Sequence, residues 1–177
     1  LVMLGWTNLH LGFIAGLAMC VAYVFIEIGD AETNLRWNRL RAAAPYLVAT
    51  LVATAANPWG VNIYSAIARQ ARIMSIHAAW IPEWRAVRIT PARLAGAFAV
   101  RNPDSAFWWL LAVALAAIIL AAARRRYGTA IVLLVGSLAA LNYARFQGPF
   151  AALVVIIGGT VLHEALIGPV IRGFFRS

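Results

Sequence analysis

The chain has 177 residues, of which 63% are hydrophobic and only 12% charged, and its formal net charge is +9. Its mean hydropathy of +0.81 is well above that of water-soluble domains, so a soluble globular fold could not bury this much apolar surface. All fifteen basic residues are arginines. They stand at the ends of apolar stretches rather than on one face, which favours membrane flanks over a nucleic-acid surface.

Cysteine and histidine usage narrows the possible chemistry. The single cysteine, Cys20, lies within an apolar stretch, so the sequence predicts no intramolecular disulfide and no cysteine metal site. The three histidines lie in separate segments without metal-ligand spacing, and no cofactor is indicated. Residues 1–4 lack the features of a signal peptide. We expect 1–177 to be a single transmembrane helical region, a fragment of a longer membrane protein.

Five apolar stretches approach the roughly 20 helical residues needed to cross a hydrocarbon core of about 30 Å. The second stretch ends at the turn signal Asn57-Pro58, and the third ends at three consecutive arginines. The predicted fold class is therefore all-α, a polytopic transmembrane helix bundle with about five membrane helices. The stretches comprise residues 9–28, 42–56, 107–123, 127–143 and 149–171.

The arginines also predict an orientation. Eight of them lie on the connections 30–41 and 124–126 and on the tail 172–177, whereas the short connection on the opposite side carries only Arg145. By the positive-inside rule the eight-arginine side is cytoplasmic, which places the long segment 57–105 outside. We expect a multi-pass protein of the cell inner membrane that has the lipid bilayer as a partner and does not bind nucleic acid.

The long outer segment is too apolar to be a plain linker. Ile63, Ile67, Ala71 and Met74 recur at three- and four-residue spacing with polar residues between them, as in a helix that lies on a membrane surface. Tryptophans later in the chain supply aromatic rings at headgroup level. We therefore predict an interfacial helix in the long outer loop.

Small and polar residues within the stretches indicate packing. Gly12 and Gly16 form a small-xxx-small pair that lets helices approach closely. Gly158 and Gly159 indicate a kink or a close helix crossing in the fifth stretch, and a ligand contact is an equally good interpretation. His163-Glu164 interrupts that stretch, and a proton relay there would need a partner that the sequence does not identify.

Three polar residues near the outer ends of the stretches are candidate ligand-binding residues. Asn8 and His10 lie where polar groups within reach of a bilayer are costly and often functional, with a sugar, a phosphate or a proton as partner. A histidine hydrogen-bonded to a neighbouring helix is the other interpretation. Arg145 could hold a phosphate in bidentate fashion, and snorkelling to lipid headgroups would explain it equally well.

Glu83 and Trp84 combine a carboxylate with an aromatic face. A carbohydrate site uses this pairing because sugar rings present both hydroxyls and C–H faces. The alternative is an aromatic membrane anchor in which Glu83 pairs with Arg85 or Arg88.

Three segments carry a family resemblance. The first is Trp-Thr-Asn-Leu-His-Leu-Gly-Phe at 6–13, the second is Ala-Asn-Pro-Trp-Gly at 56–60 with Glu83-Trp84 downstream, and the third is Ala-Arg-Phe-Gln-Gly-Pro-Phe at 144–150. In order and spacing they resemble the C-terminal half of bacterial GT-C-type integral-membrane glycosyltransferases. The sequence departs from that pattern at Leu11, where a glycine is usual, and at 146–148.

The resemblance implies an enzyme that moves a sugar from a polyprenyl-phosphate donor to an acceptor on the outer membrane face. It implies a catalytic acidic residue in the first extracytoplasmic loop, outside this fragment, as the general base. Asn8, His10, Glu83, Trp84 and Arg145 would bind substrate, with His10 and Arg145 neutralising the lipid phosphate and Glu83 and Trp84 bordering the acceptor groove. The alternative is a non-enzymatic structural or assembly subunit that binds membrane protein partners through its alanine- and glycine-rich faces.

Overall fold

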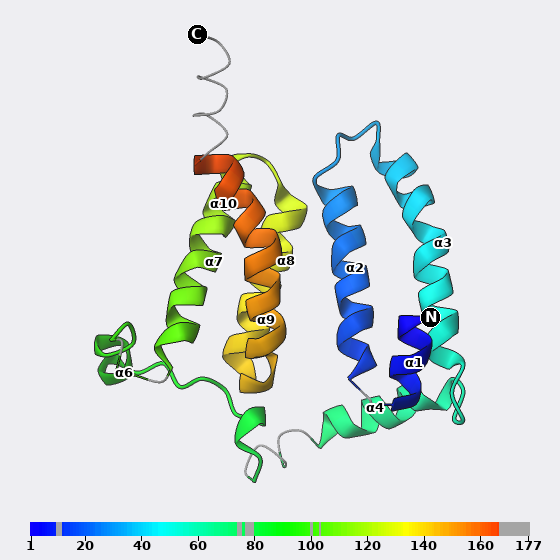
Figure 1. Ribbon diagram of the computed structural model, residues 1–177, viewed down its shortest axis with the longest axis horizontal. Helices are drawn as coiled ribbons and strands as arrows, with labels where there is room; N and C mark the ends of the chain where they lie inside the picture. Colours follow the sequence, from blue (N-terminus) through cyan, green and yellow to red (C-terminus); the bar gives the residue numbers. More distant parts are fainter. Residues whose placement is uncertain (10–11, 74–75, 77–79, 100, 103, 167–177) are drawn as a thin grey trace. The chain divides into compact units, whose positions relative to one another are not determined.

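The computed structural model describes residues 1–9, 12–73, 76, 80–99, 101–102 and 104–166, and every regular element within them is helical. The all-α class predicted from the sequence is thereby confirmed. The chain divides into two compact units, Leu1–Trp80 and Ile81–Ser177. The first unit holds α1 to α4, and the second holds the remaining helices (Figure 1).

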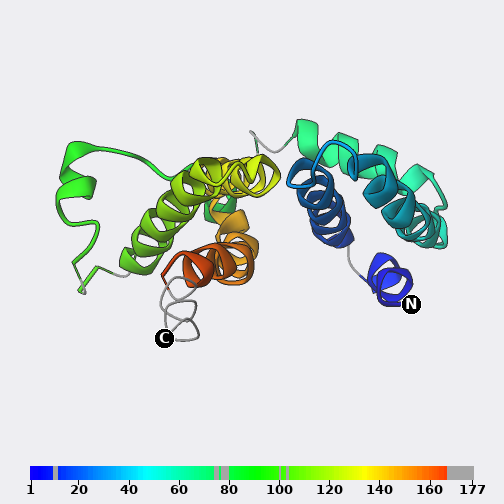
Figure 2. The same ribbon diagram turned by 90° about the horizontal axis from the view of Figure 1, so that it is seen from above.

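In the first unit, α2 (Phe13–Gly29) and α3 (Arg36–Ala55) form an antiparallel pair (Figures 1 and 2). An ion pair of 2.6 Å between Arg39 and Glu27 joins the end of α2 to the start of α3. The predicted second stretch begins at residue 42, but α3 begins six residues earlier, because the arginine-rich segment before the stretch is also helical.

The polar segment at the chain start lies in a helix of its own. Helix α1 (Val2–Leu9) precedes α2, so Asn8 stands at the end of one helix rather than at the mouth of the next. Helix α1 packs on Gly16, where an added Cβ would lie only 2.7 Å from the Trp6 ring. Gly16 therefore lies at a helix contact, as predicted, but it is the Trp6 and Met3 side chains, not a helix backbone, that occupy the space beside it.

A tight turn directs the chain from α3 into α4 (Asn62–Arg72). The Asn57 side chain donates hydrogen bonds to the carbonyls of Thr54 and Gly60 and accepts one from the backbone N–H of Trp59 at 2.8 Å. Gly60 has a φ of 54°, a conformation that glycine adopts without a steric penalty. The sequence signal for a turn at Asn57-Pro58 is therefore correct.

Helix α4 is amphipathic, as its spacing predicts. Ile63 is buried, with 1% of its surface exposed, whereas Arg69 and Arg72 are exposed at the end of the helix. The hydroxyl of Tyr64 is hydrogen-bonded to that of Thr54 in α3, and its ring meets the ring of Phe13 edge-on. Helix α4 is thereby attached to both α2 and α3. Met74, the last residue of the predicted pattern, lies outside the described residues.

In the second unit, α7 (Ser105–Ala123), α8 (Tyr127–Asn142) and a third helical segment, Ala144–Leu166, pack together (Figure 1). The third segment consists of η2 (Ala144–Phe146), α9 (Gln147–Leu153), a π-helical turn η3 (Val154–Gly158) and α10 (Gly159–Leu166). One cluster of buried apolar residues lies toward the start of α7 and includes Phe107 and Phe150. Another lies toward its end and includes Ala117, Leu133 and Val161.

The predicted close crossing in the fifth stretch is present. The π-helical turn ends at Gly158, where an added Cβ would meet the Cβ of Ala117 in α7 at 3.5 Å. A π-turn widens the helix locally, and glycine together with alanine lets the two backbones approach there.

Glu164 has a partner that the sequence does not reveal. Its carboxylate pairs with Arg126 at 2.7 Å, and its backbone carbonyl accepts a hydrogen bond from Arg124 at 3.4 Å. Arg125, with a φ of 59°, lies in the tight connection between α7 and α8. We conclude that Glu164 fastens α10 to the arginine connection at this end of the unit.

Two helical segments among the described residues are long and apolar enough to cross a membrane: α7 and Ala144–Leu166. Only 28% and 22% of their most apolar windows are buried by the rest of the protein. Helices α2 and α8 are apolar but have 17 and 16 residues. The predicted end of the fifth stretch, residues 167–171, lies outside the described residues.

Candidate functional site

Backbone hydrogen bonds hold the segment after residue 81 against the turn between α8 and η2. The short helix η1 (Pro82–Trp84) begins with a proline, whose fixed φ suits the first helical position. The N–H of Val87 then donates to the carbonyl of Leu141 at 2.7 Å, and the N–H of Ala144 donates to the carbonyl of Arg85 at 3.1 Å. These two bonds place η1 beside η2.

Glu83, Trp84 and Arg145 consequently meet, although more than 60 residues separate η1 from Arg145 in the sequence. Arg145 Nη1 lies 3.8 Å from Glu83 Oε2, and its guanidinium carbon lies 5.4 Å from the centre of the Trp84 ring. The structure therefore pairs Glu83 with Arg145, a partner that the sequence analysis did not consider. We call Glu83, Trp84 and Arg145 the outer cluster.

The ion pair of the outer cluster is loose. The side chains of Arg145 and Glu83 are 46% and 66% exposed, so water screens their attraction, and exposed pairs contribute about 0–1 kcal/mol. The guanidinium also faces the aromatic ring, which adds a weak cation–π attraction. Arg145 is therefore held near η1 but remains accessible to another anion.

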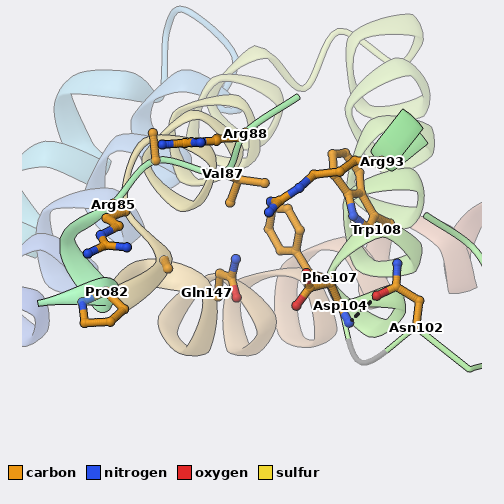
Figure 3. Close-up of a pocket in the computed structure, with 12 residues that line it drawn as sticks. Pro82, Arg85, Val87, Arg88, Arg93, Asn102, Asp104, Phe107, Trp108 and Gln147 are labelled. Carbon is orange, nitrogen blue, oxygen red and sulfur yellow. Dashed lines mark hydrogen bonds between the residues drawn. The ribbon is translucent and has the colours of Figure 1, made fainter. Parts of the chain in front are cut away.

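Residues close to the outer cluster in the sequence line an open pocket of about 540 Å³, which Figure 3 shows. Pro82 and Arg85, which flank Glu83 and Trp84 in the sequence, contribute to its wall, and so do Ala144 and Gln147, which lie close to Arg145 in the sequence. The side chains that line it are Pro82, Arg85, Ala86, Val87, Arg88, Arg93, Asn102, Asp104, Phe107, Trp108, Ala144 and Gln147. Three arginines and a single acidic residue, Asp104, thus line this space.

Side-chain hydrogen bonds hold in place the part of the pocket wall that contains Arg93, Asn102 and Asp104. Thr90 precedes α6 (Pro91–Ala95), and its hydroxyl accepts a hydrogen bond from the backbone N–H of Arg93 at 3.3 Å. Asn102 donates to the carbonyl of Gly96 at 3.1 Å and accepts from the N–H of Asp104 at 3.0 Å. The loop before α7 is closed by these bonds, and Ala97 on it is fully buried in the core that contains Phe107 and Trp108.

Asn8 lies in the other unit and has a structural role. Its amide nitrogen donates to the carbonyl of Leu4 in the same helix at 2.8 Å and to the carbonyl of Ala56 at 2.9 Å. The second bond satisfies a carbonyl at the end of α3 that has no partner within that helix. The first two segments of the resemblance therefore contact each other. His10 lies outside the described residues.

The structure adds three residues to those chosen from the sequence. Arg85, Arg88 and Arg93 line one pocket, yet in the sequence two of them were considered only as partners of Glu83, and Arg93 was not considered. Their spacing of three and five residues fits no regular element, and only the folded loop brings them together. No three His, Cys, Asp or Glu side chains gather to form a metal site within the described part of the chain.

Comparison of the chain with protein-family models, with curated proteins and with solved structures gave no match. The functional conclusions therefore rest on the residues and on the geometry described above.

Proposed function

We propose that this chain is part of an integral-membrane glycosyltransferase-like protein that uses a polyprenyl-phosphate sugar donor on the outer membrane face. The observation that carries the proposal is the outer cluster. It joins the Glu-Trp pair of the second resembling segment to the arginine of the third, through a 3.8 Å ion pair and a guanidinium facing an indole ring. A carboxylate, an aromatic face and a cation at one exposed place suit a phosphate-linked sugar.

Each side chain of the outer cluster has a proposed role. Arg145 holds the phosphate of the donor, because a bidentate charge-assisted contact is stronger than its loose pair with Glu83. That exchange releases Glu83, which borders the acceptor groove together with Trp84. The indole face of Trp84 offers an apolar surface to the C–H groups of a sugar ring. The general base is an acidic residue of an outer loop that precedes Leu1 in the full protein.

We further propose that five helices cross the inner membrane: α2, α3, α7, α8 and the segment Ala144–Leu166. The low burial of α7 and of Ala144–Leu166 supports this for those two segments, because the core helix of a soluble protein is mostly covered by protein. Helices of 16 or 17 residues are short for a span, and neighbouring helices or local thinning of the bilayer would accommodate them.

Cysteine labelling tests the membrane arrangement, because the chain has a single cysteine. In a Cys20→Ser background, Ser65→Cys in α4 should react with a membrane-impermeant maleimide on intact cells. Thr33→Cys, in the arginine-rich connection before α3, should react only after lysis. Both positions are exposed in the structure, so a difference reports the side of the membrane. Equal labelling of the two on intact cells would contradict the arrangement.

Sugar transfer tests the proposed activity. Membranes containing the natively expressed protein are supplied with radiolabelled polyprenyl-phosphate sugar, and transfer to endogenous acceptors is measured. Arg145→Ala should raise the KM for the donor about tenfold. Glu83→Gln should instead raise the KM for the acceptor and leave the donor KM unchanged or lower, since it removes a competing partner of Arg145. Unchanged transfer by Arg145→Ala would remove this residue from the site.

The assembly-subunit alternative makes a different prediction. A natively expressed product much larger than 19.2 kDa, with added helices and an acidic outer loop, supports the transferase. A product that lacks such a loop and co-purifies in constant ratio with another membrane protein supports the subunit. Intact-mass measurement after gentle detergent extraction distinguishes the two.

A further inference from the structure

The pocket beside the outer cluster has an unbalanced charge. Arg85, Arg88 and Arg93 contribute three guanidinium groups to its lining, whereas Asp104 contributes the one carboxylate. Arg88 and Arg93 are exposed, and neither belongs to an ion pair within the residues that the structure describes. Guanidinium groups that gather around one hollow without matching acids produce a positive potential that attracts anions.

The shape of the pocket suits a bound phosphoryl group. Figure 3 shows Arg93, which belongs to α6, reaching in from one side and Arg85 on the opposite side, with Arg88 above and Gln147 below in this view. The amide of Gln147 can donate a further hydrogen bond. Behind these polar groups lie Phe107 and Trp108, each only 7% exposed. An apolar wall excludes water on one side and strengthens electrostatic attraction in front of it.

The backbone that carries the arginines is fixed before any ligand binds. The hydrogen bond from Val87 to Leu141 holds the segment next to Arg88, and the Thr90 cap sets the position of Arg93 in α6. Binding at a site whose backbone is already ordered costs less conformational entropy. Only the exposed ends of the arginine side chains need to become ordered around an anion.

We propose that this pocket is a phosphate-binding site in which Arg88 and Arg93 make the principal contacts, with Gln147 as an additional donor. The bound group is a phosphoryl group, carried either by a lipid headgroup or by a water-soluble molecule. The site is separate from Arg145, which does not line the pocket. It does not depend on glycosyl transfer.

Direct binding measurements test the site. The purified natively expressed protein in an uncharged detergent is titrated with inorganic phosphate at constant ionic strength. In parallel, its affinity is measured for phosphatidic acid in nanodiscs of otherwise zwitterionic lipid. The double variant Arg88→Gln/Arg93→Gln should bind the phosphate-bearing probe at least tenfold more weakly. Arg101→Gln is the matched control, because this exposed arginine lies in the same loop but outside the pocket, and it should change the affinity less than about twofold.

A conservative variant separates specific contacts from simple charge. Arg88→Lys/Arg93→Lys keeps the charge but loses the planar fork of the guanidinium, so its affinity should fall several-fold. In an Arg145→Ala background, in which Arg145 can no longer bind phosphate, the loss of binding caused by Arg88→Gln/Arg93→Gln should persist, even where Arg145→Ala impairs sugar transfer. Failure of the pocket site and failure of the proposed transferase are thus distinguishable.

The results of these measurements either identify the kind of molecule that carries the phosphate or contradict the proposal. Binding of inorganic phosphate that requires Arg88 and Arg93 indicates a water-soluble ligand. Binding of phosphatidic acid alone, with the same requirement, indicates a lipid headgroup. The proposal is overturned if the wild type binds neither probe, or if Arg101→Gln weakens binding as much as the double glutamine variant.

Discussion

Asn8 and Arg145 are both polar residues near the ends of apolar stretches, and the sequence makes both candidates for ligand binding on the same grounds. The structure treats them differently. The amide group of Asn8 donates two hydrogen bonds of 2.8 and 2.9 Å to backbone carbonyls, one of them across the unit at Ala56. Arg145 makes one 3.8 Å ion pair with an exposed carboxylate and lies over an aromatic ring.

This difference separates a residue that builds the fold from one that is available to a ligand. A ligand at Asn8, which is itself exposed, would have to replace two short, directional hydrogen bonds to the backbone. A phosphate at Arg145 has to displace only weak, screened contacts. The position of a polar residue in the sequence does not show whether it stabilises the fold or is available to a ligand. That depends on which groups the folded chain brings into contact with its side chain.

The largest effect should come from Gly16, on which α1 packs to hold Asn8 in place. Gly16→Leu forces a side chain into space occupied by the Trp6 ring, 2.7 Å from the position of its Cβ. We expect a loss of about 1–3 kcal/mol in the free energy of unfolding, the usual cost of overpacking. Thermal unfolding in detergent measures it. Gly5→Leu is the control, because an added Cβ at Gly5 has no atom within 4 Å among its described surroundings.

A smaller effect is expected for Asn8→Ala. The variant removes the bond to Ala56, so stability should fall by about 1 kcal/mol while donor affinity stays unchanged. Asn142→Ala is the matched control, since the Asn142 amide makes only a local bond to the carbonyl of Leu138 and should cost less than about 0.5 kcal/mol. If Asn8→Ala instead lowered the affinity for the donor and left stability unchanged, Asn8 would be a ligand-binding residue rather than one that stabilises the fold.

The smallest effect should appear in double-mutant cycles on two exposed ion pairs. Arg126 and Glu164 are 2.7 Å apart and should show a coupling of about 0.5 kcal/mol. Arg145 and Glu83, at 3.8 Å, should show a coupling near zero. The measured quantity is the non-additivity of unfolding free energies for the alanine variants. A larger coupling energy for Arg145 and Glu83 than for Arg126 and Glu164 would mean that the Arg145–Glu83 ion pair stabilises the fold, as the hydrogen bonds of Asn8 do.

Local sequence patterns predicted much of the helical organisation. The third and fourth stretches match α7 and α8 within two residues at each end, because uniform apolar runs bounded by Asp104 and by arginines leave few alternatives. The amphipathic spacing beginning at Ile63 correctly predicted α4. The separate helix α1 was not predicted, since residues 9–12 carry no strong helix-breaking signal and the apolar pattern runs through them.

The outer cluster was predicted only as separate parts. Glu83, Trp84 and Arg145 were each chosen from the sequence, but their meeting depends on the hydrogen bonds that join residues 85–87 to 141–144. The pocket beside them was not predicted. Arg85 and Arg88 belong to an irregular segment and Arg93 to the short helix α6, and periodicity gives no information about how such pieces meet.

The sequence by itself determined that this chain is helical and rich in apolar surface, because helix formation and hydropathy depend on residues close together along the chain. The tertiary structure decided which polar groups make short hydrogen bonds within the fold and which make only a loose ion pair. Asn8 reaches a carbonyl 48 residues away, and Arg145 reaches a carboxylate more than 60 residues away. Contacts at such separations are set by how helices and loops pack, and local patterns cannot specify them.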